Sequence, residues 1–309
     1  CTRAGKSVLL KTVNLIEKHT MQRHWVVPDI RALGLIQPIR NSNDRPNMQD
    51  ARPITLLESP MKLFTKGLNN RTQTALNDHI LKNKDSVLDP TQYGFLFNSS
   101  CLHALTTFTN TLEDANEYDK SLYILNCDVA RAYDSLEFWS SEIASRRLKL
   151  PEAFIQIMGE FDRNAKSQVI TPHGVTEAFP CERGMRQGDS LSPLRYLIFT
   201  DMILSKWADG KDPYRLGDPT LSPAMQSTKP TVTAQGFVDD LLGLSSSYRG
   251  ITERAQHLAH FLLEHGVTLS IKKTFVVALN HTNRTKTTMD PVLVSAWDKS
   301  KNRVSPAVK

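Results

Sequence analysis

Short apolar segments alternate with polar ones along the whole chain, and their spacing predicts a mixture of helices and strands. Apolar residues at helical spacing predict helices over residues 7–24, 56–80, 135–148, 151–161, 192–207 and 251–262. Apolar runs rich in β-branched and aromatic residues predict strands over residues 35–40, 122–128, 168–171, 175–179, 232–238, 241–244, 267–271 and 274–279. Because these elements do not follow a regular βαβ rhythm, the pattern favours an α+β fold over a doubly wound sheet.

Proline and glycine mark the breaks between these elements. Residues 38–53 hold three prolines and predict a loop that follows the first strand. Residues 209–230 hold four prolines and two glycines, from which we expect an irregular surface insertion. Pro193 falls in the first turn of a predicted helix, where proline is tolerated, and Gly266 is a natural helix stop.

The composition is that of an ordinary globular chain. Of 309 residues, 40% are apolar and 23% are charged, which disfavours collagenous, disordered and disulfide-scaffold classes. Its apolar runs are far shorter than the roughly 18 residues of a membrane span, and no signal peptide is evident. Four scattered cysteines fit a reducing, intracellular compartment. Since the chain begins with Cys1, we expect it to be a fragment of a longer protein.

Charge is distributed unevenly along the chain. Residues 1–71 carry 12 basic and 5 acidic residues, for a net charge of +7, and residues 281–309 carry 6 and 2, for +4. The middle, residues 72–280, carries 20 basic and 25 acidic residues, for −5, which recovers the total of +6. This distribution suggests a polyanionic partner held around a carboxylate-rich site. The alternative is that solvated surface charges are merely uneven.

Three aspartates stand where apolar strands are predicted to end. Asp128 follows one strand, and the pair Asp239-Asp240 lies between two others. Adjacent carboxylates repel each other unless a hard cation such as Mg²⁺ neutralises them. If these strands are neighbours, the three carboxylates could hold two metal ions about 3.5–4 Å apart for an in-line displacement at phosphorus. The alternative is that Asp239-Asp240 is only a hairpin turn, in which Asp is common.

Six segments occur in a fixed order that resembles the motifs of reverse transcriptases. They are Arg-Pro-Ile within residues 51–57, Gln-Tyr-Gly-Phe at 92–95, Asp with Ala-Tyr-Asp within 125–134, Gln-Gly-Asp-Ser-Leu-Ser-Pro within 184–194, Phe-Val-Asp-Asp at 237–240, and Lys-Lys-Thr within 269–274. The Arg-Pro-Ile and Gln-Gly-Asp forms are most similar to those of non-LTR, LINE-type retrotransposons. The resemblance covers roughly residues 25–277.

The resemblance implies a right-hand polymerase fold. It divides the chain into an N-terminal helical extension (1–30), fingers (31–120) and a palm built on an antiparallel sheet (121–280). Finger-side segments are expected near 150–185. Residues 281–309 would be a disordered tail or the truncated start of a thumb, so the thumb is expected to be largely absent.

By the same resemblance the chain would be an RNA-directed DNA polymerase. Its partners would be an RNA template, a DNA primer or target DNA, and dNTPs, and its cofactor two Mg²⁺ ions, with Mn²⁺ as a substitute. Target-primed copying would need access to the nucleus. No feature of the sequence indicates an oligomeric state.

The family's catalytic roles carry over to matching positions. Asp128 and Asp239 would bind the metal ions together with the backbone carbonyl of Val129, and Asp240 would be the third carboxylate. Lys273 would protonate the pyrophosphate leaving group, and Lys272 could exchange roles with it.

The nucleotide-binding roles also carry over. Arg40 and Arg52 would grip the triphosphate, since the guanidinium fork binds phosphate oxygens in pairs. Tyr133 would exclude a ribose 2′-hydroxyl, unless its ring is only part of the core. Gln187 and Gly188 would shape the nucleotide pocket.

Two further functions stay open at this point. An RNA-dependent RNA polymerase shares the palm and the Asp-Asp turn, although Tyr133 and Gln187-Gly188 argue against it. A catalytically inactive nucleic-acid-binding relic is the other, because Ser270 replaces an expected Asn and Arg195 interrupts a helix that is usually apolar.

Overall fold

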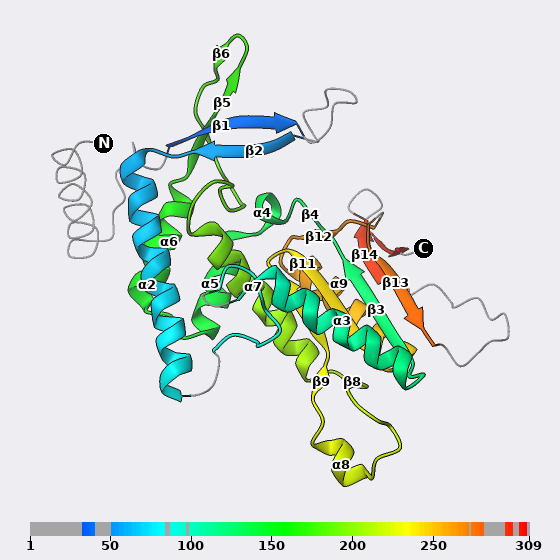
Figure 1. Ribbon diagram of the computed structural model, residues 1–309. Coiled ribbons are helices and arrows are strands. Elements are labelled where there is room, and N and C mark those ends of the chain that lie inside the picture. The colour runs from blue at the N-terminus through cyan, green and yellow to red at the C-terminus, as the bar shows by residue number, and fades with distance from the viewer. Residues whose placement is uncertain are drawn as a thin grey trace. The chain divides into compact units, whose positions relative to one another are not determined.

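The computed structural model describes residues 33–40, 51–83, 87–96, 99–271, 273–280, 294–298 and 303–307 (Figure 1). The helix and extension predicted within residues 1–30 lie outside these residues. The described chain forms two compact units: a first unit from Cys1–Asp85 and Tyr133–Tyr196, and a second unit from Ser86–Ala132 and Leu197–Lys309. Residues 86–120 therefore group with the predicted palm, and 133–149 with the predicted fingers. The names fingers and palm stay predictions.

A sheet of the order β2-β1-β5-β6 forms one layer of the first unit (Figure 1). Its strands are β1 (Leu33–Arg40), β2 (Ala51–Leu56), β5 (Lys166–Thr171) and β6 (Gly174–Val175), with β7 (Phe179–Pro180) also paired to β5. Strand β2 was not predicted because Pro53 indicated a loop, yet β2 is the edge strand, where proline is tolerated. The strand predicted over 175–179 is instead split between β6 and β7, with residues 176–178 outside either strand.

Helices complete the first unit. They are α2 (Ser59–Asn83), α4 (Ala132–Ser135), α5 (Phe138–Arg147), α6 (Glu152–Arg163) and the first turns of α7 (Ser192–Ala208). The rings of Phe64 on α2 and Phe161 on α6 pack edge to face, with centroids 5.6 Å apart. The prediction of a single helix over 135–148 is wrong at its start, because residues 136 and 137 are not helical and separate α4 from α5.

The second unit is built on an antiparallel sheet of the order β10-β11-β3-β13. Its strands are β3 (Leu122–Cys127), β10 (Ala234–Phe237), β11 (Asp240–Ser245) and β13 (Phe275–Leu279). Beyond β3 the chain forms β4 (Val129–Ala130), which pairs with β12 (Thr268–Leu269). The strands predicted over 122–128, 241–244 and 274–279 are confirmed, and they are neighbours in the sheet.

Two helices cover this sheet, α3 (Cys101–Glu117) and α9 (Tyr248–Glu264) (Figure 1). Ala115 of α3 lies in one buried cluster with Leu122, Ile124 and Leu244, and α9 packs against β3 and β11. Helix α3 was not predicted, although Leu105, Phe108, Leu112 and Ala115 recur at helical spacing; its threonines have low helix propensity and weaken that signal. The predicted helix over 251–262 is confirmed as part of α9, and Gly266, with φ +74°, follows its end.

The insertion at 209–230 holds the short helix α8 (Pro223–Ser227) and β8 (Tyr214–Arg215), which pairs with β9 (Thr231–Val232). Within 281–309, the two strands β14 (Val294–Asp298) and β15 (Arg303–Ala307) pair antiparallel. The assignment of that stretch to a tail or a thumb stays a prediction. None of the helices in the described parts of the chain has the length and apolarity needed to cross a membrane.

Candidate active site

The Asp-Asp pair lies at a tight hairpin turn in the second unit. Phe237 and Asp240 are the last paired residues of β10 and β11, so Val238 and Asp239 form a two-residue turn. Val238 has φ +64°, whereas Asp239 is not among the residues with positive φ. A single positive φ at the first turn position is typical of a type II′ hairpin, where glycine is the usual residue. Asp239 therefore lies at the tip of a turn in which valine occupies the position usually taken by glycine.

The sheet register brings Asp128 to the same edge. Leu241 of β11 is paired with Cys127 of β3, and the residue before Leu241 is Asp240 while the residue after Cys127 is Asp128. Because the strands run antiparallel, Asp128 and Asp240 lie at the same end of β3 and β11. The sheet order therefore brings the backbones of Asp128 and Asp240 to one end of the sheet, and a metal site formed by their side chains stays a prediction.

The backbone of Asp128 is held by the segment 270–274. Its carbonyl oxygen accepts a hydrogen bond from the Ser270 N–H at 2.8 Å, and its own N–H donates to Thr274 Oγ1 at 3.4 Å. The Asn126 side chain adds a bond from Nδ2 to the Lys273 carbonyl oxygen at 3.1 Å. The Lys-Thr motif thus fixes the backbone from which the Asp128 carboxylate extends. Ser270 makes its contact through the backbone, so the substitution of the expected Asn leaves it intact.

Lys273 lies against the predicted metal ligand. Its Nζ is 3.4 Å from Asp128 Oδ2, and the two side chains are 70% and 30% exposed. An ion pair this exposed is held weakly, since water competes with both partners. The lysine is therefore within reach of the site, as predicted, and easily displaced from the carboxylate.

The donor set suits a hard divalent cation, because carboxylate oxygens from β3 and from the hairpin turn are placed at one end of the sheet. Val129, whose carbonyl is the further expected ligand, lies in β4 opposite Leu269. In the conformation described, no three His, Cys, Asp or Glu side chains among the described residues are grouped closely enough to hold a metal ion. Metal binding would therefore require the carboxylate side chains to move closer together.

The residues predicted to bind the nucleotide all belong to the first unit. Gly188 has φ +107°, and a Cβ there would lie 2.7 Å from the Thr55 carbonyl oxygen. The Thr55 N–H donates to the Gln187 carbonyl oxygen at 2.6 Å. Strand β2 and the Gln-Gly turn thus lie in direct contact, and glycine is required there for both its backbone angle and the close approach.

Gln187 points its amide toward a carboxylate. Its Nε2 donates to both Asp134 oxygens, at 3.0 and 3.1 Å. This contact links the Gln-Gly motif to the Ala-Tyr-Asp motif, two segments about 50 residues apart. The role of Gln187 at the sugar or the templating base stays a prediction.

The two arginines lie on the β1–β2 hairpin. Arg52 is exposed and is paired in register with Ile39, whereas Arg40 is paired with Ala51. They are close in the fold but are not a directly opposed pair. The side chain of Arg40 lies outside the described part of the structure, so its contact with a triphosphate stays a prediction.

Tyr133 is only partly buried. Its ring stacks on that of Tyr196, with centroids 5.0 Å apart and an angle of 23°, and its carbonyl oxygen accepts the Met185 N–H at 2.6 Å. One face of the ring is therefore packed, which fixes its orientation. This packing agrees with a core role for the ring, and its role at the nucleotide sugar stays a prediction.

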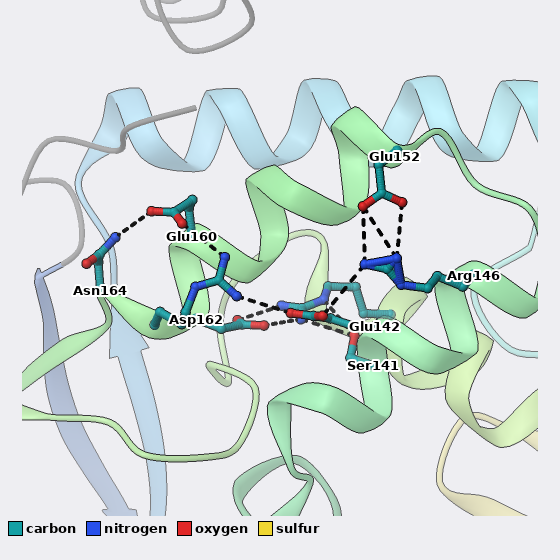
Figure 2. A network of polar contacts seen from close by, with 9 residues as sticks. Ser141, Glu142, Arg146, Glu152, Glu160, Asp162 and Asn164 are labelled. Atoms are coloured by element: carbon teal, nitrogen blue, oxygen red, sulfur yellow. Dashed lines mark hydrogen bonds and ion pairs between the residues drawn. The ribbon is translucent and has the colours of Figure 1, made fainter. Parts of the chain in front are cut away.

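Arg195, which interrupts an apolar stretch at the start of α7, has a structural partner in the first unit. Its Nη1 donates to Asp162 Oδ1 at 3.0 Å, its Nη2 to Asp162 Oδ2, and its Nε to Ser141 Oγ at 3.2 Å. Figure 2 shows Ser141 and Asp162 in this network. Burial opposes the charge of Arg195, but Asp162 outweighs it and raises the arginine pKa. The departure from the family pattern is therefore compensated by a buried ion pair.

The sequence and the fold assign the chain to a known family. Residues 39–299 match the sequence profile of the family described as reverse transcriptase (RNA-dependent DNA polymerase). The chain therefore belongs to this family of RNA-directed DNA polymerases, and the predicted α+β right-hand polymerase fold is confirmed. Members of the family generally use divalent metal ions.

Relatives place it more narrowly among retrotransposon proteins. The chain is 26% identical over 241 residues to the Retrovirus-related Pol polyprotein from type-2 retrotransposable element R2DM of Drosophila melanogaster, covering 78% of this chain and 21% of that protein. It is 24% identical over 267 residues to the Pol polyprotein from the R2 element of Popillia japonica, covering 86% of this chain and 34% of that protein. The prediction of a non-LTR retrotransposon reverse transcriptase domain is confirmed. The chain spans only a fifth to a third of the length of these relatives.

Telomerases are among the solved structures with a similar fold. Apo telomerase from Candida tropicalis, truncated from the C-terminal domain, has a TM-score of 0.57 at 15% identity, covering 93% of this chain and 57% of that one. Telomerase from Candida albicans in complex with a TWJ fragment of telomeric RNA has a TM-score of 0.56 at 14% identity, covering 97% of this chain and 49% of that one. At this identity the likeness concerns the fold alone.

Proposed function

We propose that this chain carries out RNA-directed DNA synthesis, extending a primer 3′-hydroxyl with dNTPs on an RNA template. The observation that supports this most directly is the sheet register, which places Asp128 and the Asp239-Asp240 turn at one end of β3 and β11. Carboxylates from these positions are the oxygen ligands that a hard divalent cation would take. RNA template, DNA primer or target DNA, and dNTPs are the partners proposed with this function.

Two Mg²⁺ ions are the proposed cofactor. Asp128 and Asp239 would hold them, together with the Val129 carbonyl oxygen, and Asp240 would be the third carboxylate. The metal would lower the pKa of the attacking hydroxyl and neutralise charge on the triphosphate.

The chain's own residues supply the remaining functions. Lys273, whose ammonium lies near Asp128, would deliver a proton to the leaving pyrophosphate. Arg40 and Arg52 would bind triphosphate oxygens. Gln187 and Gly188 would line the nucleotide pocket, with Tyr133 held by Tyr196 in the orientation that excludes a ribose 2′-hydroxyl.

A primer-extension assay tests the proposal. The chain is incubated with an RNA template, an annealed DNA primer, dNTPs and Mg²⁺, and compared with Asp239→Asn. We expect metal-dependent extension by the unsubstituted chain and at least a thousandfold less by the variant, since several kcal/mol of transition-state stabilisation is lost. Equal and negligible extension by both would contradict the proposal and favour a non-catalytic nucleic-acid-binding function.

An RNA-dependent RNA polymerase is the alternative that shares the palm. It is distinguished by replacing dNTPs with NTPs in the same assay. We expect the unsubstituted chain to prefer dNTPs and Tyr133→Ala to lose much of that preference, because the smaller side chain leaves room for a 2′-hydroxyl. A preference for NTPs in the unsubstituted chain would reverse the assignment.

A further inference from the structure

The segment 91–94 contacts the Asp-Asp hairpin within the second unit. The Tyr93 N–H donates to the Gly236 carbonyl oxygen at 2.8 Å, and the Gly236 N–H donates to the Thr91 carbonyl oxygen at 2.9 Å. Gln92 and Gly236 form a parallel bridge between these bonds. The Gln-Tyr-Gly motif therefore runs alongside β10, directly before the turn that carries Asp239.

Val238 occupies a backbone conformation that a β-branched residue rarely adopts. Its φ is +64°, and only 3% of the residue is exposed. Such conformations persist only where the surrounding structure holds them, and they are concentrated at functional sites. The question is which residue holds Val238, since a change of its φ would redirect the adjoining Asp239.

Gln92 makes the contact that answers this question. Its side-chain Oε1 accepts hydrogen bonds from the Val238 N–H at 3.3 Å and from the Gly94 N–H at 3.0 Å, while its Nε2 donates to Thr200 Oγ1 at 3.3 Å. Gln92 is 3% exposed, so water cannot readily replace it. Without this acceptor, two buried N–H groups would lack a partner, which is costly.

Two glycines make the close packing of this segment possible. A Cβ at Gly94 would lie 2.6 Å from Val238 Cγ2 and 2.8 Å from Val238 N. A Cβ at Gly236 would lie 2.7 Å from Leu204 Cδ1 and 3.0 Å from Gln92 Nε2. Neither position has a positive φ, so glycine is needed for close approach and not for backbone freedom. Both glycines lie where Gln92 and the hairpin meet.

We infer that Gln92 is a positioning residue that holds Val238 in its left-handed conformation and thereby fixes the direction of the Asp239-Asp240 turn. In this role Gln92 acts through the backbone of the hairpin. The inference rests on the proposed function only in that the turn it holds is the catalytic one. The backbone restraint itself can be tested without any enzymatic activity.

Hydrogen exchange at the Val238 amide is the first test. Gln92→Met keeps the length of the side chain but removes the acceptor. The matched control Thr200→Val keeps that acceptor and removes the partner of Nε2, together with the bond from Thr200 Oγ1 to the Leu197 carbonyl oxygen. We expect exchange at Val238 to rise at least about tenfold in Gln92→Met and less than about threefold in Thr200→Val, while the Leu241 and Leu244 amides of β11 are unchanged. Unchanged exchange at Val238 would overturn the inference, as would an equal rise throughout β11.

Primer-extension kinetics, with and without Val238→Gly as a suppressor of Gln92→Met, provide the second test. In primer extension we expect Gln92→Met to lower kcat about tenfold to a hundredfold and to change the KM for dNTP less than about threefold. In a Val238→Gly background, Gln92→Met should lower kcat less than about threefold, since glycine adopts positive φ without restraint. If Gln92→Met lowers kcat as much in the Val238→Gly background as in the unsubstituted chain, Gln92 does not act through Val238 and the inference is overturned.

A second variant is available if Gln92→Met does not fold. Gly94→Ala keeps the Gln92 side chain but would bring a Cβ to within 2.8 Å of Val238 N, so it should displace Val238 and raise its exchange at least about tenfold. Gly67→Ala is its control, because a Cβ at Gly67 meets nothing within 4 Å. If the unsubstituted chain fails to extend a primer, the proposed function fails while the exchange experiment still decides the role of Gln92. Normal Val238 exchange in Gly94→Ala would overturn that role.

Discussion

Two aspartates, one in each unit, show how differently the fold treats a carboxylate. Asp162 in the first unit is 7% exposed, and two nitrogens of Arg195 bind its two oxygens. Asp128 in the second unit has a side chain 30% exposed, and the partner recorded for its carboxylate is a single lysine that is 70% exposed. Full burial with a bidentate partner is typical of a structural ion pair. A partly exposed carboxylate with an easily displaced partner is typical of a site that exchanges ligands.

Asp128→Asn should separate activity from stability most clearly. We expect primer extension to fall at least a thousandfold, because a proposed metal ligand loses its charge, and the free energy of unfolding to change by less than about 1 kcal/mol. Primer extension and urea denaturation measure the two effects. A loss of stability of several kcal/mol would mean that Asp128 is structural like Asp162, and the comparison would fail.

Arg195→Met should have the largest effect on stability. It leaves the Asp162 carboxylate buried without its partner, so we expect the free energy of unfolding to fall by about 3–5 kcal/mol in urea denaturation. The matched control is Arg146→Met on the same network in Figure 2, where Arg146 and Glu152 are about half exposed. That pair should contribute less than about 1 kcal/mol. Equal costs for the two variants would remove the distinction between buried and exposed pairs.

Asp114 offers an intermediate case within the second unit. Lys120 pairs with it, Tyr214 OH donates to it at 2.7 Å and the Gly217 N–H at 2.6 Å, which anchors the 209–230 insertion. Burial raises the pKa of Asp114, but these contacts outweigh burial and lower it.

Because the pKa of Asp114 is lowered in the folded state, its contribution to the free energy of unfolding decreases as the pH falls. Its stabilisation is complete above the unfolded pKa of about 3.9 and is lost as pH falls through the folded value. We expect Asp114→Asn to lower the free energy of unfolding by about 1–3 kcal/mol at pH 7 and to make little difference at pH 2–3. Urea denaturation across that range tests the sign. A cost that is the same at pH 7 and pH 2–3 would contradict it.

Lys273→Ala should have the smallest effect. We expect the free energy of unfolding to change by less than about 1 kcal/mol, and Mn²⁺ affinity, measured by electron paramagnetic resonance without nucleotide, to rise up to about fivefold as Asp128 is released. Lys166→Ala, an exposed lysine of the first unit, should leave Mn²⁺ affinity unchanged. Weaker Mn²⁺ binding in Lys273→Ala would indicate that the lysine helps to shape the metal site.

The sequence by itself determined the elements whose signal is local. Strand β3 and helices α6, α7 and α9 follow from periodicity and from proline and glycine positions, because these depend on neighbours a few residues away. A tight turn next to Asp239 was also predicted, but the structure places it at Val238-Asp239, one residue earlier than the predicted strand over 232–238 allowed. Six motifs in a fixed order indicated the family, and the family resemblance predicted the catalytic and nucleotide-binding residues. The sequence also singled out Arg195 as a departure, though not its partner.

Only the tertiary structure decided what depends on distant contacts. Helix α3 needs the sheet to bury its apolar side, and β2 carries Pro53 because it is an edge strand. The motif at 92–95 was noticed in the sequence, but its contact with Val238 joins residues 146 positions apart. Asp128 and Asp162 have the same side chain, and their local sequences do not reveal that one is enclosed by Arg195 and the other left beside Lys273. That difference arises from packing, which sets the cost of leaving a charge without a partner.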